Sequence, residues 1–246
     1  MSDANNLEHL VGALERAQRH WEERHRKAAA SPASAPPPLT IALSRQAGTP
    51  GTSVAREVGA RLGWPVYDLE LLQRIAQEMG LRVRLLESVD ERRQSWLREC
   101  IEAFVSAPVP GDYVSESAFV RHLVETVLSL GTHGECVIVG RGTAQLLAPQ
   151  TTLRVRLVGL LADRVAAVSR RFNLSRKEAE RHVQETERER VRFVRDHFQK
   201  DPLDPANYDL MLNSSRWSVG ECAELIIQAV HALQVRTPVT ARAVAT

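Results

Sequence analysis

Apolar and polar positions follow two periodicities along most of this chain. Short apolar runs bounded by polar or turn residues predict about five β-strands, at 39–44, 65–67, 136–139, 153–159 and 208–212. Longer segments with apolar residues three or four positions apart predict helices, at 53–62, 69–79, 92–105, 117–130, 162–172, 175–198 and 219–233. This alternation predicts an α/β fold in which a parallel sheet of about five strands is covered by helices on both faces.

The N-terminal part has a different pattern. Apolar residues between Leu7 and Trp21 recur at helical spacing, and a segment rich in alanine, serine and proline follows them. The composition predicts three parts: an amphipathic helix and linker at 1–38, an α/β domain at 39–235 and a flexible tail at 236–246. We expect the helix, residues 5–27, to pack on the domain, to mediate self-association or to dock a partner, and the pattern leaves these uses open.

Composition narrows the function classes. The chain has 32 basic and 30 acidic side chains, a balance too even to favour nucleic acid or a membrane surface as partner. No apolar run nears the roughly 20 residues of a membrane span, and the first residues lack the pattern of a signal peptide. The three cysteines are far apart and show no metal-binding spacing, which indicates buried thiols in a reducing compartment. We expect a cytoplasmic protein.

Residues 40–55, TIALSRQAGTPGTSVA, carry the strongest signal for chemistry. An apolar run leads into a loop of small residues and then into a helical pattern, which is where α/β proteins bind phosphate through backbone amides. In the usual G-x-x-x-x-G-K-[ST] motif, Gly51 would be the lysine and Pro50 the preceding glycine. Arg45 is a candidate for the missing positive charge. Ser53 either caps the helix or offers its hydroxyl to Mg²⁺, and an ordinary tight turn explains the loop as well.

Polar side chains also follow two other predicted strands. Arg141 comes between two glycines after a buried strand, where its planar fork suits a phosphate or a carboxylate, although a structural ion pair is the alternative. Asp68 ends the strand at 65–67, where it either caps the next helix or contacts a nucleobase or sugar. Ligands of parallel sheets bind at these carboxyl ends.

The segment 173–200 is rich in arginine. Glutamates are interleaved with the arginines up to Glu189, so a solvated helix with pairs four residues apart explains most of these charges. The arginines continue beyond Glu189. The segment therefore also suits a mobile lid that closes over a polyphosphate.

Taken together, five short motifs resemble the cytidylate kinase-like family of P-loop nucleoside monophosphate kinases, from about residue 39 to residue 230. The motifs, in chain order, are LSRQAGTPG, WPVYDLELL, VIVGRG, NLSRKEAERHVQETERER and DPANYDLMLNSS. The resemblance implies a P-loop sheet with a helical lid, and transfer of the γ-phosphoryl group of ATP to a nucleoside monophosphate with Mg²⁺ bridging the phosphates. CMP is the favoured acceptor.

The resemblance also assigns roles to residues. It implies ATP phosphate contacts for the loop residues, an acceptor site on the strand ends and two arginines on the lid: Gly48, Gly51, Thr52 and Ser53; Asp68 and Arg141; Arg188 and Arg190. Arg164 and Arg170 are weaker candidates for the ATP side, and Glu187 replaces the aspartate of the family pattern D-x-x-R.

Two departures from the family pattern lead to an alternative function. Absence of the lysine is typical of the branch, but Pro50 removes one amide donor from the loop. Gly142 stands where true cytidylate kinases often carry aspartate. The leading hypothesis is an ATP-dependent kinase, and the alternative is a nucleotide-binding regulator with little or no turnover.

Overall fold

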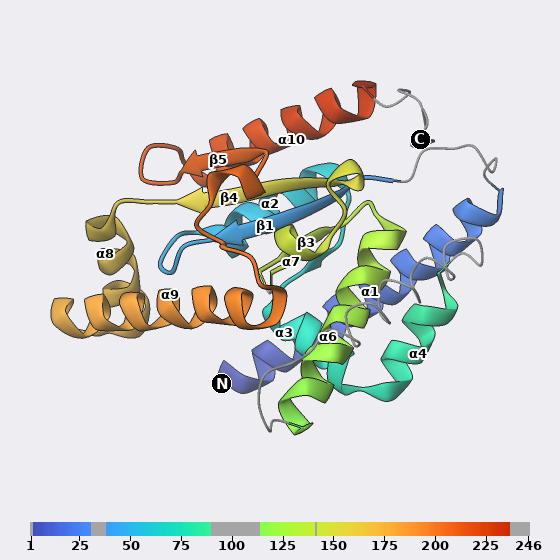
Figure 1. Cartoon of the computed structure of the whole chain (residues 1–246), viewed down its shortest axis with the longest axis horizontal. Helices are drawn as coiled ribbons and strands as arrows, with labels where there is room; N and C mark the ends of the chain where they lie inside the picture. The colour runs from blue at the N-terminus through green and yellow to red at the C-terminus, as the bar shows by residue number, and fades with distance from the viewer. Residues whose placement is uncertain (1, 31–37, 90–113, 141, 237–246) are drawn as a thin grey trace.

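The computed structural model describes residues 2–30, 38–89, 114–140 and 142–236, and it contains a parallel five-stranded sheet (Figure 1). The strand order is β2-β3-β1-β4-β5, and every pairing is parallel. The strands are β1 (Thr40–Arg45), β2 (Val66–Tyr67), β3 (Val137–Val139), β4 (Thr152–Val158) and β5 (Leu210–Asn213). Each lies within two residues of its predicted bounds, so the fold class predicted from the sequence is confirmed.

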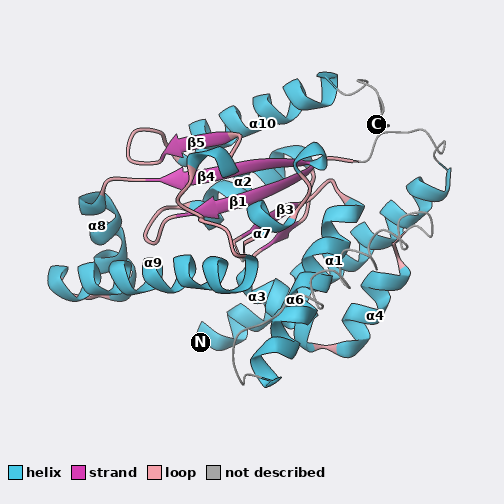
Figure 2. Cartoon of the chain, viewed as in Figure 1, coloured by secondary structure: helices cyan, strands magenta, loops and turns pink. Residues whose placement is uncertain are grey.

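Helices cover both faces of the sheet (Figure 2). The helices of the described residues are α1 (Ser2–Ala30), α2 (Gly51–Leu62), α3 (Leu69–Gln77), α4 (Met79–Glu87), α6 (Val114–His133), α7 (Thr143–Leu146), α8 (Leu161–Phe172), α9 (Arg176–Phe198) and α10 (Val219–Arg236). In Figure 1, α1, α3, α4 and α6 gather at one end of the molecule, and α8 and α9 lie at the other. No helix within the described ranges is both long and apolar enough to span a membrane.

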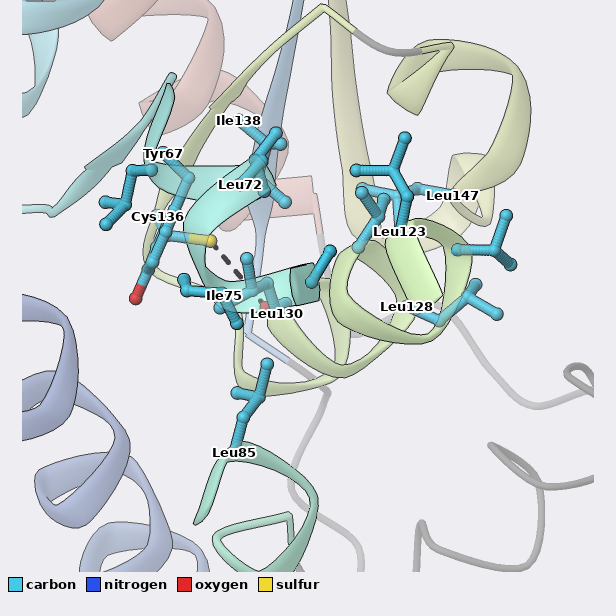
Figure 3. Close-up of a cluster of buried hydrophobic side chains, with 14 of the residues drawn as sticks. Tyr67, Leu72, Ile75, Leu85, Leu123, Leu128, Leu130, Cys136, Ile138 and Leu147 are labelled. Atoms are coloured by element: carbon cyan, nitrogen blue, oxygen red, sulfur yellow. Dashed lines mark hydrogen bonds between the residues drawn. The ribbon is translucent and has the colours of Figure 1, made fainter. Parts of the chain in front are cut away.

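The central strand β1 contributes to two separate apolar cores. Ile41 and Leu43 point toward α2 and α10, whereas Ala42 between them points toward α3 and α6. Successive side chains of a strand face opposite sides of the sheet, and all three are fully buried because both faces are covered. Figure 3 shows the second of these cores, where Leu72, Leu123 and other apolar side chains from the two helices and the sheet point toward one another.

Two parts of the helix prediction are wrong. The helix predicted at 69–79 ends at Gln77, because Glu78 adopts an extended conformation before a new helix, α4, begins. The short helix α7 was also not predicted. The helix predicted at 92–105 lies outside the described residues.

The N-terminal helix α1 packs on the α/β domain. Its Ala17 is fully buried, and Trp21 is only 2% exposed. The indole Nε1 of Trp21 donates a hydrogen bond to the Tyr67 hydroxyl at 2.9 Å, and Arg24 forms an ion pair with Glu135 at 2.8 Å. The apolar stripe therefore serves packing within the chain. A role of residues 5–27 in self-association or partner docking stays a prediction.

The helices α8 and α9 form a hairpin at the position of the predicted lid. Asn173 ends α8 in the left-handed conformation. A capping box begins α9, because the Ser175 hydroxyl accepts from the Glu178 amide while the Glu178 carboxylate accepts from the Ser175 amide at 2.9 Å. These local signals fix the turn that returns α9 toward the carboxyl ends of the strands.

Candidate active site

A cavity of about 370 Å³ lies at the carboxyl ends of the strands. Residues from β1, from the end of β3, from β4 and from α9 line it, among them Ser44, Arg45, Gly140, Arg156, Glu187 and Arg190. Parallel sheets bind their ligands at this edge. Three of the lining residues named here are arginines from different elements, so the cavity suits an anion.

The loop after β1 is fixed against β4 and α8. The Gln46 amide donates to the Leu157 carbonyl at 3.0 Å, and the Gln46 side-chain oxygen accepts from the Gly159 amide at 3.0 Å. Gly48 has a φ of +85°, and a Cβ atom there would lie 2.6 Å from the Arg164 carbonyl oxygen. Only glycine fits this position, because a side chain would be strained and would also collide with backbone.

The Arg45 side chain lies against Gly51, the position at which the usual motif has its lysine. A Cβ atom at Gly51 would overlap the Arg45 Cδ atom and would lie 3.0 Å from the Arg45 Cβ. At the far end, the Arg45 guanidinium approaches Gly140, since a Cβ there would be 2.5 Å from Nη1. The arginine stem thus fills the space beside Gly51, and its charge faces the cavity. The role of Arg45 as the replacement for the lysine charge stays a prediction.

The first turn of α2 contradicts the prediction that Ser53 caps this helix. The helix begins at Gly51 with Pro50 as the N-cap, and no side chain caps it. Ser53 is an exposed residue in the first turn, so its interpretation as a helix cap is wrong. Its role, and that of Thr52, toward Mg²⁺ or phosphate stays a prediction. Helix geometry leaves the first amides of α2 without an intrahelical acceptor, as an anion site requires.

Asp68 caps α3. Its Oδ1 atom accepts from the Leu71 amide at 3.2 Å, and Oδ2 lies 3.5 Å from the Arg56 guanidinium. The capping interpretation is therefore correct. Asp68 does not line the cavity described above, although the next residue, Leu69, does. Its role in acceptor binding stays a prediction.

Arg156 on β4 is a site residue that the sequence analysis missed. It is 4% exposed, and its Nη1 atom donates to the hydroxyls of Tyr208 at 3.0 Å and Ser44 at 3.3 Å. The guanidinium also stands 5.3 Å from the centre of the Tyr208 ring. The one signal in the sequence is that Arg156, like Arg154, interrupts the apolar run of this strand, at a position whose neighbours Val155 and Leu157 are buried.

The structure separates the two lid arginines. Arg190 lines the cavity and donates from Nη1 to the Arg45 carbonyl at 3.1 Å, and burial lowers its pKa. Arg188 is exposed and lines a second cavity of about 730 Å³ beside α8, together with Arg192 and Arg195. Residues two positions apart on a helix face about 200° apart, which explains the separation.

The other arginines named from the sequence have different positions. Arg141 lies outside the described residues. Arg164 donates to the Gly159 carbonyl at 3.0 Å and to the Ala47 carbonyl at 3.2 Å, so it clamps the loop against α8. Arg170 is exposed on α8.

The residues present fit a polyphosphate better than a metal held by protein alone. The described residues contain no group of three or more histidines, cysteines or acids that could hold a metal ion. A glycine-dependent loop, the first amides of α2 and several arginines suit phosphate oxygens. Mg²⁺ commonly binds through phosphates and water with few protein ligands, so the Ser53 hydroxyl is the candidate here.

Comparisons with known proteins agree with this geometry. A family model described as the cytidylate kinase-like family matches residues 40–216. A cytidylate kinase from Methanopyrus kandleri is 25% identical over 199 residues, which cover 80% of this chain and 96% of that protein. A crystal structure of a protein from Eubacterium ventriosum has the same fold, with a TM-score of 0.62 and 20% identity over 79% of this chain and 98% of the other. The chain belongs to the cytidylate kinase-like family.

Proposed function

We propose that the protein transfers the γ-phosphoryl group of ATP to a nucleoside monophosphate, with CMP as the favoured acceptor. The observation that carries this proposal is the convergence of Arg45, Arg156 and Arg190 on one cavity, beside a loop that requires glycine at position 48. Membership of the cytidylate kinase-like family supports the same reaction class.

The reaction needs positioning and charge neutralisation more than covalent chemistry from the protein. An oxygen of the acceptor phosphate forms a bond to the γ-phosphorus, the bond to the β–γ bridging oxygen breaks, and ADP leaves. Arg45 from β1 and Arg190 from α9 would both contact the phosphates, since both line the cavity. When bound with ATP, Mg²⁺ would neutralise further charge on the phosphates.

Asp68 and Arg141 are proposed for the acceptor side. In the sequence they follow β2 and β3, the two strands that lie on the opposite side of β1 from β4 and β5. Gly142 begins α7 with a φ of +70°, and Phe198 of α9 packs against it. A movement of α9 would therefore reach the backbone next to Arg141.

The test is ADP formation by the full chain with ATP and Mg²⁺ against a panel of nucleoside monophosphates. We expect turnover with CMP, and its loss in Arg141→Ala and Arg190→Gln. Arg181→Gln is the control, because Arg181 is 76% exposed on the same helix as Arg190 and pairs with Glu185 along the helix. ATP binding without ADP formation for any acceptor would contradict the proposal and favour the regulator.

We also propose a cytoplasmic location. Cys136 and Cys222 are free and buried, as expected in a reducing compartment, and burial raises the pKa of the Cys136 thiol to about 12.

A further inference from the structure

One carboxylate on the lid contacts both the loop and the floor of the cavity. The Oε2 atom of Glu187 accepts from the Ala47 amide at 2.7 Å and lies 3.9 Å from Nη1 of Arg164. Its Oε1 atom lies 3.6 Å from Nη2 of Arg156. The two oxygens of a single anion therefore join α9 to the loop after β1, to α8 and to β4.

The charges around this carboxylate are out of balance. The side chains of Arg156 and Arg164 are 5% and 12% exposed, and they share Glu187 as a counter-ion. The other contacts of Arg156 are hydroxyls of Ser44 and Tyr208, which are neutral. A buried cation requires a nearby anion, and one carboxylate between two guanidinium groups leaves the cluster with an excess of positive charge. A phosphate group, with more charge and more oxygens, would match this cluster better.

The hydrogen bond at the Ala47 amide also indicates that Glu187 occupies a phosphate position. A backbone N–H at the turn after a first strand commonly donates to a phosphate oxygen. Here the Ala47 N–H donates to a carboxylate oxygen of Glu187 instead. A carboxylate and a phosphate present their oxygens at similar separations. Both cannot use the Ala47 amide fully at the same time.

We propose that Arg156 is a further phosphate-binding residue and that Glu187 is an internal anion, which a bound phosphate group displaces from Ala47 and Arg156. The inference rests on the proposed function to the extent that the cavity takes a phosphorylated ligand. Glu187 holds α9 against the loop through the Ala47 amide, and phosphate binding would release that contact. Arg156 and Arg164 exchange one counter-ion for another, so neither becomes an unpaired buried charge.

This competition has a measurable consequence. If the ligand must displace Glu187, the free energy of that displacement weakens its apparent affinity. Removing the carboxylate should then tighten phosphate binding. We expect Glu187→Gln to bind inorganic tripolyphosphate about tenfold more tightly than the wild type. Arg156→Gln should bind it at least about tenfold more weakly, because a charge-assisted contact is lost.

The experiment is calorimetric titration of the full chain with tripolyphosphate, without acceptor. Glu185→Gln is the matched control, since it removes the same charge from α9 at a half-exposed side chain that pairs with Arg181. Glu187→Asp is a second variant, because it keeps the charge and withdraws the carboxylate from the Ala47 amide. We expect tighter binding in both Glu187 variants and little change in Glu185→Gln.

Three results would overturn the proposal. They are unchanged or weaker binding in both Glu187 variants, wild-type binding in Arg156→Gln, and no binding of tripolyphosphate to any variant. The titration requires no turnover, so a chain that binds as expected but forms no ADP would refute the proposed kinase reaction alone. A chain that forms ADP but shows wild-type affinity in every variant would refute the roles proposed here for Arg156 and Glu187 and would leave the kinase reaction standing.

Discussion

Gly48→Ala tests whether the loop approaches α8 as closely as the structure shows. Two effects act at this position. The φ of +85° is a left-handed conformation, and the added methyl group would lie 2.6 Å from the Arg164 carbonyl oxygen and 2.9 Å from the Arg164 Cβ. Those atoms belong to a helix that Arg164 itself fastens to Ala47 and Gly159. Relief of the collision therefore requires the loop to move away from α8.

The magnitude follows from separating these effects. Placing alanine in a left-handed conformation costs about 1–2 kcal/mol. Forcing an extra methyl group into a packed contact costs about 1–3 kcal/mol more. Gly63 supplies the matched control, because it has a φ of +70° and nothing lies within 4 Å of an added Cβ. Gly63→Ala should show the conformational cost alone, so the two variants should differ by about 1–3 kcal/mol.

The assay is urea unfolding followed by circular dichroism, together with tripolyphosphate titration of each folded variant. We expect Gly48→Ala to be the less stable variant and to bind tripolyphosphate more weakly, while Gly63→Ala keeps the wild-type affinity. Equal stability and equal affinity in the two variants would show that the loop does not lie against Arg164, and the description of the phosphate site would fail.

The remaining predictions concern α1, two buried histidines and the lid. Trp21→Ala should cost about 3–5 kcal/mol in the free energy of unfolding, against less than about 1 for the 44% exposed Trp217; equal losses in urea unfolding would contradict the packing of α1. Burial lowers the pKa of His20 to about 4 and that of His133 to about 3. The contribution of each histidine to the free energy of unfolding is therefore complete above its unfolded pKa of about 6.5. Lowering the pH from 7 to 5 should reduce that free energy by about 2 kcal/mol for each histidine; a urea midpoint that stays constant as the pH is lowered would refute this. Arg190→Gln should lower kcat/KM for the nucleotide reaction about a hundredfold, or about 3 kcal/mol, and an unchanged value in the ADP assay would remove Arg190 from the site.

The sheet could be predicted from the sequence because its strands are short, mainly apolar runs, and the three inner strands β3, β1 and β4 are largely buried on both faces. The break at Glu78 could not. Apolar residues recur at every second position from Met79 to Leu85, which is not helical spacing, and in α4 only Leu81 and Leu85 among these four are buried. Tertiary packing on α3 and α6 decides that segment rather than its own periodicity.

The residue patterns predict the candidate site where its residues follow strands directly, and the family resemblance adds Arg190 on α9. Arg45 was found because it ends β1, whereas Arg156 was read as one more position of an apolar strand. The charge spacing on α9 predicts helical pairs between Glu187 and neighbouring arginines, and the family resemblance adds that Glu187 replaces an aspartate. Its partners instead come from β4, α8 and the loop, and no periodicity along the chain relates residues so far apart.

The absence of the usual lysine at position 51 and the presence of Arg45 are structurally linked. A lysine on the first turn of the helix reaches the phosphates with a flexible stem and a point charge, whereas a guanidinium presents a planar fork. Here the Arg45 stem occupies the space that a side chain at position 51 would need, so Gly51 is required by the arginine beside it. Pro50 fits the same arrangement, because it is the N-cap residue before α2, where its missing amide removes no helical hydrogen bond. In this chain the positive charge therefore comes from the end of the strand, where the usual motif has it on the helix. A motif that lacks its lysine still places a cation at the edge of the cavity.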